Sequence, residues 1–263
     1  MASTIDGIGT EQRAKSDLVA RLRAAGCVFA KDEADLLLAD GREVEPLVVR
    51  RVAGEPLEQI LGWAQFCGMR IAVEPGVFVP RVRTGYLVER ALDFALPGAV
   101  VLDLCCGTGA VGAALVAVAS GIELYASDLD PGAVATARRN LRPDRVLEGD
   151  LFDALPAALR ARLDLVVVNA PYVPTEAIAT MPAEARLHEH RLALDGGADG
   201  LDLHRRIAAT AGEWMSPASH LLIETSAAQA PLSAELFAAA GFAAEVAHSD
   251  EYDGTVVTAT RAR

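Results

Sequence analysis

Short apolar runs alternate with longer amphipathic stretches through most of the chain, and this rhythm is the clearest pattern in the sequence. The runs predict buried strands at residues 100–104, 123–127, 145–147, 163–168, 220–224, 243–248 and 255–260. The stretches at 110–119, 201–214 and 227–240 predict helices, and Asp130-Pro131 begins another, because proline suits the first turn of a helix. Repeated strand–helix units predict an α/β fold: a parallel, doubly wound sheet with helices on both faces and an antiparallel edge formed by the last two strands.

The first part of the chain has a different rhythm. Residues 10–61 have the pattern of short amphipathic helices, with a break at Gly26. Residues 66–79 alternate between apolar and polar positions and carry turn residues at Glu74-Pro75-Gly76, which predicts a β-hairpin. We therefore expect a small helical N-terminal domain at residues 1–64, a β-hairpin linker at 65–83 and the α/β domain at 84–263.

Composition and charge narrow the range of functions. The 263 residues are 52% hydrophobic and 23% charged, which suits one large core with a small accessory domain. The net charge of −12 argues against a general nucleic-acid binder, because such a protein needs a basic face to neutralise phosphates. Nucleic acid is therefore not an expected partner.

Cysteine usage and hydropathy bear on location. The four cysteines show no paired framework and no C-x-x-C spacing, which predicts a reduced, cytoplasmic protein. Residues 1–15 lack the apolar core of a secretory signal, and the longest apolar stretch, 110–119, is too short to span a bilayer. We expect no membrane partner. We also expect no metal at His188-Glu189-His190, because no further ligand cluster accompanies it.

A glycine-containing turn follows the first strand of the α/β region. With the end of that strand it reads Asp103-Leu104-Cys105-Cys106-Gly107-Thr108-Gly109. Ligands of open α/β sheets collect at the carboxyl ends of the strands, so this turn is a candidate cofactor site. Asp128 ends the second strand about twenty residues later, where a carboxylate would accept hydrogen bonds from both ribose hydroxyls. After the third strand, Asp150 is placed to bond an adenine amino group, and Leu151 and Phe152 to form an apolar wall.

The charge at this turn favours S-adenosylmethionine over a dinucleotide. The spacing G-x-G-x-x-G occurs at Gly107, Gly109 and Gly112, but a lone match of this kind is weak. Asp103 would repel a pyrophosphate, whereas it would attract the ammonium group of a sulfonium amino acid. The residues expected to bind the cofactor are Asp103, Cys105, Cys106, Gly107, Thr108, Gly109, Asp128, Asp150, Leu151, Phe152 and Asn169.

The fourth strand leads into Asn169-Ala170-Pro171-Tyr172, the segment that says most about the reaction. An amide nitrogen is a poor nucleophile because its lone pair is delocalised, so an enzyme that methylates it must position it and orient its hydrogens. The side-chain oxygen of Asn169 can accept one N–H and the carbonyl of Ala170 the other. Pro171 stiffens the turn, and Tyr172 offers an aromatic face to the planar amide. These four are the predicted catalytic residues, and this chemistry needs no dedicated general base.

Taken together in this order, these segments resemble the HemK/PrmC family of protein-glutamine N(5)-methyltransferases. The resemblance runs from about residue 50 to residue 260 and includes two strings specific to the family, Pro80-Arg81 and Gly196-Gly197-Ala198-Asp199-Gly200-Leu201. It implies a Rossmann-like class I methyltransferase fold and methyl transfer to the side-chain amide of a glutamine in a protein. The family's known targets are peptide-chain release factors, methylated in a Gly-Gly-Gln loop. It also implies that the N-terminal domain helps to dock the protein partner.

Three positions depart from the family pattern. Ala170 stands where the family has the first proline of Asn-Pro-Pro-Tyr, and Gly85 stands where it has glutamate. Cys105-Cys106-Gly107 replaces Gly-Thr-Gly in the cofactor turn. These changes are typical of a divergent, actinobacterial-type paralogue whose protein target can differ from a release factor.

Three other functions remain open from the sequence. A nucleic-acid amino-methyltransferase acting on a flipped base could use a similar loop, although the acidic composition disfavours it. A small-molecule methyltransferase would be favoured if the N-terminal domain formed a lid over a closed pocket. A non-catalytic interaction protein could have kept the fold. The sequence leaves the oligomeric state open.

Overall fold

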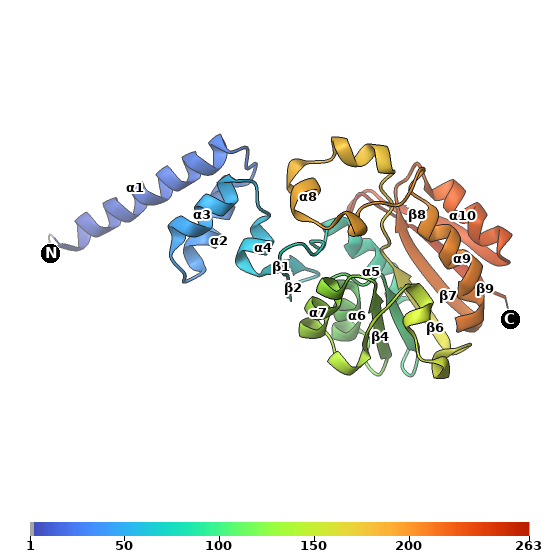
Figure 1. Cartoon of the computed structure of the whole chain (residues 1–263). Coiled ribbons are helices and arrows are strands. Elements are labelled where there is room, and N and C mark those ends of the chain that lie inside the picture. The colour runs from blue at the N-terminus through green and yellow to red at the C-terminus, as the bar shows by residue number, and fades with distance from the viewer. Residues whose placement is uncertain (1–2, 263) are drawn as a thin grey trace.

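The structure, a computed structural model, describes residues 3–262, so Met1, Ala2 and Arg263 at the ends of the predicted domains lie outside it. The N-terminal helices lie at one end of the molecule, the sheet with its helices at the other, and a small hairpin between them (Figure 1). In chain order the helices and strands are α1 (Ser3–Ala24), α2 (Ala30–Ala39), α3 (Val44–Val52), α4 (Leu57–Leu61), β1 (Trp63–Phe66), β2 (Met69–Ala72), α5 (Gly85–Leu92), β3 (Val100–Leu104), α6 (Ala110–Val118), β4 (Glu123–Asp128), α7 (Pro131–Asn140), β5 (Val146–Glu148), β6 (Leu163–Val168), α8 (Ala183–His188), α9 (Asp202–Trp214), β7 (Met215–Thr225), α10 (Ala230–Ala239), β8 (Phe242–Ser249) and β9 (Gly254–Arg261).

The larger sheet has seven strands in the order β5-β4-β3-β6-β7-β9-β8. Neighbours from β5 to β7 run parallel, whereas β9 runs antiparallel to both β7 and β8. The predicted parallel sheet with an antiparallel edge is therefore confirmed. β7 starts earlier than predicted, because Met215 already pairs with Leu163 before a shift in register.

Each face of this sheet has its own core, since successive side chains of a strand point to opposite faces. Leu102 and Val166 pack with α9 and α10 on one face, and Val101 and Val167 pack with α5 and α6 on the other. Because helices cover both faces, a ligand reaches the central strands only at their ends. None of the described helices is long and apolar enough to cross a membrane.

The N-terminal helices enclose a separate small core. Its buried members are Leu18, Leu22, Ala30, Ala34, Leu37, Leu47, Val48, Leu57 and Ile60. A buried ion pair between Arg51 and Glu33, 2.6 Å long, joins α3 to α2. The side-chain amide of Gln59 donates to the backbone oxygens of Val77 and His188, each at 3.1 Å. The segments around Val77 and His188 lie side by side, since Gly76 and Glu189 form a bridge, so these two bonds attach the N-terminal helices to both segments at one place.

The hairpin is present, but its turn is not where the sequence predicts it. β1 and β2 pair antiparallel, and the chain reverses at Cys67 and Gly68, whose φ angles are +45° and +78°. A two-residue turn of this kind requires positive φ at both positions. Cysteine rarely adopts that conformation, so the pattern of turn residues favoured 74–76 instead. Residues 74–77 form a separate bend after the hairpin.

Candidate active site

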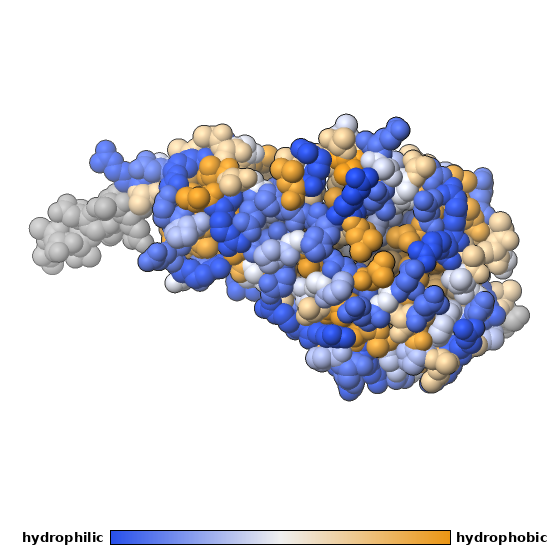
Figure 2. Space-filling view, viewed as in Figure 1, coloured by the Kyte–Doolittle hydropathy of each residue, from blue (hydrophilic) through white to orange (hydrophobic). Residues whose placement is uncertain are grey.

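A cavity of about 1260 Å³ opens at the carboxyl ends of β3, β4 and β6. Apolar side chains gather near the middle of the face shown in Figure 2, between α8 and the pair α6 and α7. This volume exceeds the roughly 300–1000 Å³ of a typical small-molecule site, so it leaves room for an acceptor beside a cofactor. The predicted site residues that line it are Asp103, Cys105, Cys106, Gly107, Thr108, Asp128, Asp150, Leu151, Asn169, Ala170, Pro171 and Tyr172.

Asp128, at the end of β4, joins the two loops of the cofactor half. Its carboxylate accepts the backbone N–H of Gly107 at 2.8 Å through one oxygen and that of Asp130 at 2.9 Å through the other. Burial raises the pKa of Asp128. The two backbone bonds fix the carboxylate at the cavity wall, and each oxygen keeps a lone pair for a ligand hydroxyl.

Asp103 is buried at the end of β3. It accepts the backbone N–H of Gly112 at 2.8 Å, and burial raises its pKa to about 8. A cationic ammonium group beside it would favour its charged form. Gly109, predicted to bind the cofactor, lies outside the cavity lining. A Cβ there would come within 2.8 Å of Leu141, so this glycine allows the turn to pack against the end of α7.

The adjacent cysteines of the turn line the cavity as thiols. Burial raises the pKa of both Cys105 and Cys106 well above the ordinary value, so both stay protonated at neutral pH. Cys105 has φ +58°, a backbone conformation that residues with side chains rarely adopt. Since only thiolates are good nucleophiles, these sulfurs serve as small apolar wall atoms.

The loop after β5 contributes one residue fewer to the cavity wall than the sequence predicts. Asp150 lines the cavity and pairs with Arg206 of α9, at 2.7 Å, while Leu151 lies on the cavity wall. Phe152 is not part of that wall: it lies in the core, where its ring stacks on Trp214 at 6.2 Å between centroids. The sequence pattern does not single out Arg206, because a charged residue on an amphipathic helix normally faces solvent.

The segment after β6 is held by two neighbouring elements. Asn169 Nδ2 donates to the hydroxyl of Thr84 at 3.3 Å, and no residue whose side chain is described donates to the Asn169 side-chain oxygen, which is left as an acceptor. The Tyr172 hydroxyl donates to Glu224 at the end of β7, at 3.1 Å. Burial raises the pKa of Tyr172 and of Glu224, and the hydroxyls of Thr84 and Tyr172 oppose the rise in Glu224. Thr84 and Glu224 were not among the predicted site residues. The available signal was a charged residue closing an apolar strand.

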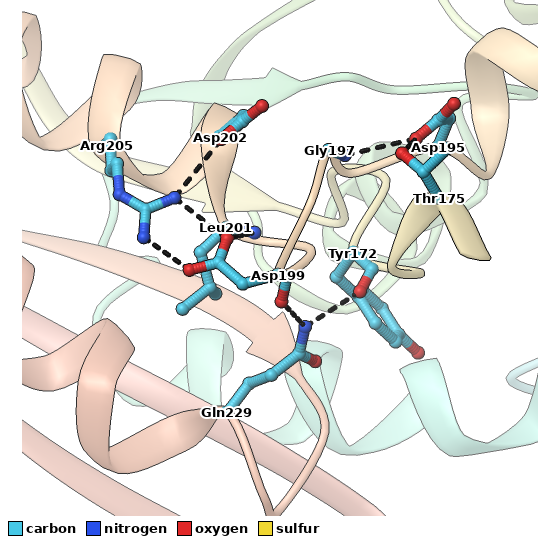
Figure 3. Close-up of polar contacts among 9 residues, drawn as sticks. All are labelled: Tyr172, Thr175, Asp195, Gly197, Asp199, Leu201, Asp202, Arg205 and Gln229. Atoms are coloured by element: carbon cyan, nitrogen blue, oxygen red, sulfur yellow. Dashed lines mark hydrogen bonds and ion pairs between the residues drawn. The ribbon is translucent and has the colours of Figure 1, made fainter. Parts of the chain in front are cut away.

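Residues 194–200, here called the support loop, underlie this segment. Gln229, just before α10, donates to the backbone oxygens of Tyr172 and Asp199, both at 2.9 Å (Figure 3). Arg205 holds the Asp199 carboxylate from the other side at 2.9 Å. Gly200 lies so close to the backbone of Tyr172 that an added Cβ would be 2.2 Å from the Tyr172 backbone oxygen. The backbone of Tyr172 is therefore fixed by direct contact with the support loop.

The His188-Glu189-His190 segment makes polar contacts with charged residues of other elements. Glu189 is buried and accepts from Arg81 at 2.5 Å and from the backbone N–H of Val79 at 3.2 Å. His190 contacts the carboxylate of Asp130 at 2.5 Å. These contacts connect the loop that carries α8 to both halves of the cavity.

We expect Asp128→Ala to raise the dissociation constant for S-adenosylmethionine by about tenfold to a hundredfold, because hydrogen bonds to a charged group are lost. Calorimetric titration measures the constant, and circular dichroism checks that the variant folds. Asp144→Ala, which removes an exposed carboxylate paired with Arg142, is the matched control and should bind normally. Unchanged affinity in Asp128→Ala would contradict the ribose assignment.

Several known proteins are similar to this chain in sequence. The family described as "Methyltransferase small domain" matches residues 69–199. The release factor glutamine methyltransferase of Geobacter sulfurreducens is 39% identical over 200 residues, covering 74% of this chain and 69% of that protein. The one from Cereibacter sphaeroides is 37% identical over 249 residues, covering 86% and 88%. A 4-amino-L-phenylalanine/4-methylamino-L-phenylalanine methyltransferase of Streptomyces pristinaespiralis is 34% identical over 233 residues, covering 84% and 78%.

The cavity suits the cofactor of such enzymes, S-adenosylmethionine. It has a buried carboxylate at Asp103 for an ammonium group, a fixed carboxylate at Asp128 for ribose hydroxyls, and apolar wall atoms between them. The chain matches both release factor glutamine methyltransferases over more than two thirds of their length. It therefore belongs to the release factor glutamine methyltransferase family.

Proposed function

We propose that this protein transfers the methyl group of S-adenosylmethionine to the side-chain amide nitrogen of a glutamine in a polypeptide, with a peptide-chain release factor as the target. The observation that carries the proposal is the orientation of Asn169. Its nitrogen is held by Thr84, so its oxygen is the free acceptor at the cavity wall, next to the cofactor half. That is the group needed to fix one N–H of a carboxamide.

The chemistry assigned to the chain is positioning. The oxygen of Asn169 and the carbonyl of Ala170 accept the two amide hydrogens and so direct the nitrogen lone pair. Tyr172, anchored by Glu224, presents its ring to the amide plane. The bound cofactor supplies a methyl group on a positively charged sulfur. On transfer, S-adenosylhomocysteine would be the leaving group, and the methylated amide would lose one proton to water.

The test is methyl transfer with the full-length protein and labelled S-adenosylmethionine. The acceptor is a release factor prepared without prior methylation, and mass spectrometry maps the label. We expect one labelled glutamine in the Gly-Gly-Gln loop. Label on another residue type, or no protein labelling, would refute the proposal.

We also assign polypeptide docking to the helical N-terminal domain at residues 1–64, joined by the linker at 65–83 to the methyltransferase domain at 84–263. Two contacts support this role: Glu58 lines the cavity, and Arg51 lies 3.5 Å from Glu184 of α8. The N-terminal helices thus contribute to the cavity's edge, where a polypeptide would enter. A cytoplasmic location fits this partner and the free cysteines.

A second candidate is N-methylation of a small aromatic amine. It is favoured by the Streptomyces pristinaespiralis relative, whose name describes methylation of 4-amino-L-phenylalanine. Including that amino acid in the transfer assay separates the two functions, because labelling of the amine without labelling of any glutamine would select the second.

A further inference from the structure

Four arginines line the main cavity, and one of them differs from the rest. Three form ion pairs with carboxylates of the chain: Arg81 with Glu189 at 2.5 Å, Arg191 with Asp195 at 3.0 Å and Arg206 with Asp150 at 2.7 Å. Arg83 forms no ion pair and no side-chain hydrogen bond with any residue whose side chain is described. Its guanidinium is a free cation at the cavity wall.

Arg83 lies at the acceptor end of the cavity. It belongs to the short 3₁₀ helix Val82–Thr84, and the next residue, Thr84, holds Asn169. Burial raises the pKa values of Tyr172 and Glu224, and the charge of Arg83 opposes the rise in both. The positive charge is therefore felt where the acceptor amide is expected to lie.

The backbone of Arg83 is supported from behind. A Cβ on Gly254 would come within 2.8 Å of the Arg83 carbonyl oxygen, and one on Gly85 within 2.8 Å of the Tyr252 ring. The turn between β8 and β9 therefore packs directly on this segment. A rigid backbone with an exposed, unpaired guanidinium is suited to binding an anion from outside.

The charges along the rest of the cavity edge indicate where an anionic group of the acceptor can bind. Glu58 lines the edge formed with the N-terminal helices, so an acidic group arriving there would be repelled, whereas Glu184 on α8 is paired with Arg51. Arg83 is placed to receive it instead, and a guanidinium binds a carboxylate through two parallel hydrogen bonds. Resting on the proposed function, we infer that Arg83 binds a side-chain carboxylate of the acceptor polypeptide, so that the enzyme favours a glutamine with an acidic residue close by.

The test measures peptide binding as well as methyl transfer, so that this inference and the proposed function can fail separately. End-capped glutamine peptides carry one Asp, Asn or Lys in turn at each position near the glutamine. Their affinities for the protein loaded with S-adenosylhomocysteine are measured by calorimetry. We expect an Asp peptide to bind about tenfold more tightly than its Asn counterpart, as for one charge-assisted bond at a partly exposed site. The difference should shrink with added salt.

Variants connect the preference to Arg83. Arg83→Gln should bind Asp and Asn peptides equally, at the affinity of the wild type for Asn, and Arg83→Glu should favour the Lys peptide. Arg162→Gln, an exposed arginine at the opposite end of β6, should keep the wild-type preference. Equal wild-type affinities, or a preference for Asp that survives in Arg83→Gln, would overturn the inference.

A small-molecule source of the carboxylate is tested by 4-amino-L-phenylalanine and its carboxamide. If a difference in affinity that depends on Arg83 is seen only between these two compounds, and not between the Asp and Asn peptides, the polypeptide form of the inference is wrong. Absence of methyl transfer to the unmethylated release factor would refute the proposed function, and the binding measurements would still decide the role of Arg83.

Discussion

Replacing Asn169 with alanine is expected to lower turnover by at least about a hundredfold, the scale seen when a positioning group is lost from an active site. The variant removes the free amide oxygen that would accept one N–H of the acceptor. It leaves Asp103 and Asp128 in place, and these are the main polar groups of the cofactor half. Affinity for S-adenosylmethionine should therefore stay close to that of the wild type. Single-turnover methyl transfer and calorimetric titration measure the two quantities.

Two further variants sharpen this experiment. Asn169→Asp keeps an oxygen acceptor but loses the donor to Thr84, so it should retain more activity than Asn169→Ala. Thr84→Val keeps the asparagine but frees its amide to rotate, so it should lower turnover less than Asn169→Ala does. Near-normal turnover in Asn169→Ala would count against the assigned mechanism. A large loss of cofactor affinity would show that the effect lies in binding.

Much of the fold follows from the spacing of apolar positions. The run at 163–168 matches β6 at both ends, and the run at 100–104 matches β3, because a strand buried on both faces is apolar at nearly every position. Less was predictable where backbone conformation departs from residue preference. The hairpin turn at Cys67 is one case. The start of β7 at Met215 is another, because a register shift extends the pairing through a polar stretch.

The candidate site, like the fold, has residues that the sequence predicts and others that it does not. Asp103, Asp128 and Asn169 end parallel strands that are neighbours in the sheet, so the topology brings them to one edge as soon as the strands are identified. Thr84 and Arg206 reach the cavity from helical elements whose orientation depends on tertiary packing. Their neighbours in sequence carry no sign of that packing. The sequence also does not show whether Phe152 lies on the cavity wall or in the core, because both environments are apolar.

Gly200→Ala should lower turnover on the order of a hundredfold, the effect of about 1 Å of misplacement at a reacting centre. The new Cβ would lie 2.2 Å from the backbone oxygen of Tyr172 and 2.3 Å from the Gln229 amide nitrogen. One contact is backbone, and the side chain in the other is fixed by two hydrogen bonds, so relief requires the support loop and the Tyr172 segment to separate. The positive φ of +80° adds strain of roughly 1 kcal/mol. Cofactor affinity should change little, because the cofactor turn follows a different strand.

Gly98→Ala isolates the contribution of strain in this comparison. Gly98 has φ +87°, close to that of Gly200, but an added Cβ there meets no atom within 4 Å. This variant should show a slightly lower Tm and unchanged turnover, whereas Gly200→Ala should lose turnover even at temperatures where it is fully folded. Methyl transfer at several temperatures below both unfolding transitions measures the difference. If the two variants turn over at similar rates, contact with the support loop does not position Tyr172 for the reaction.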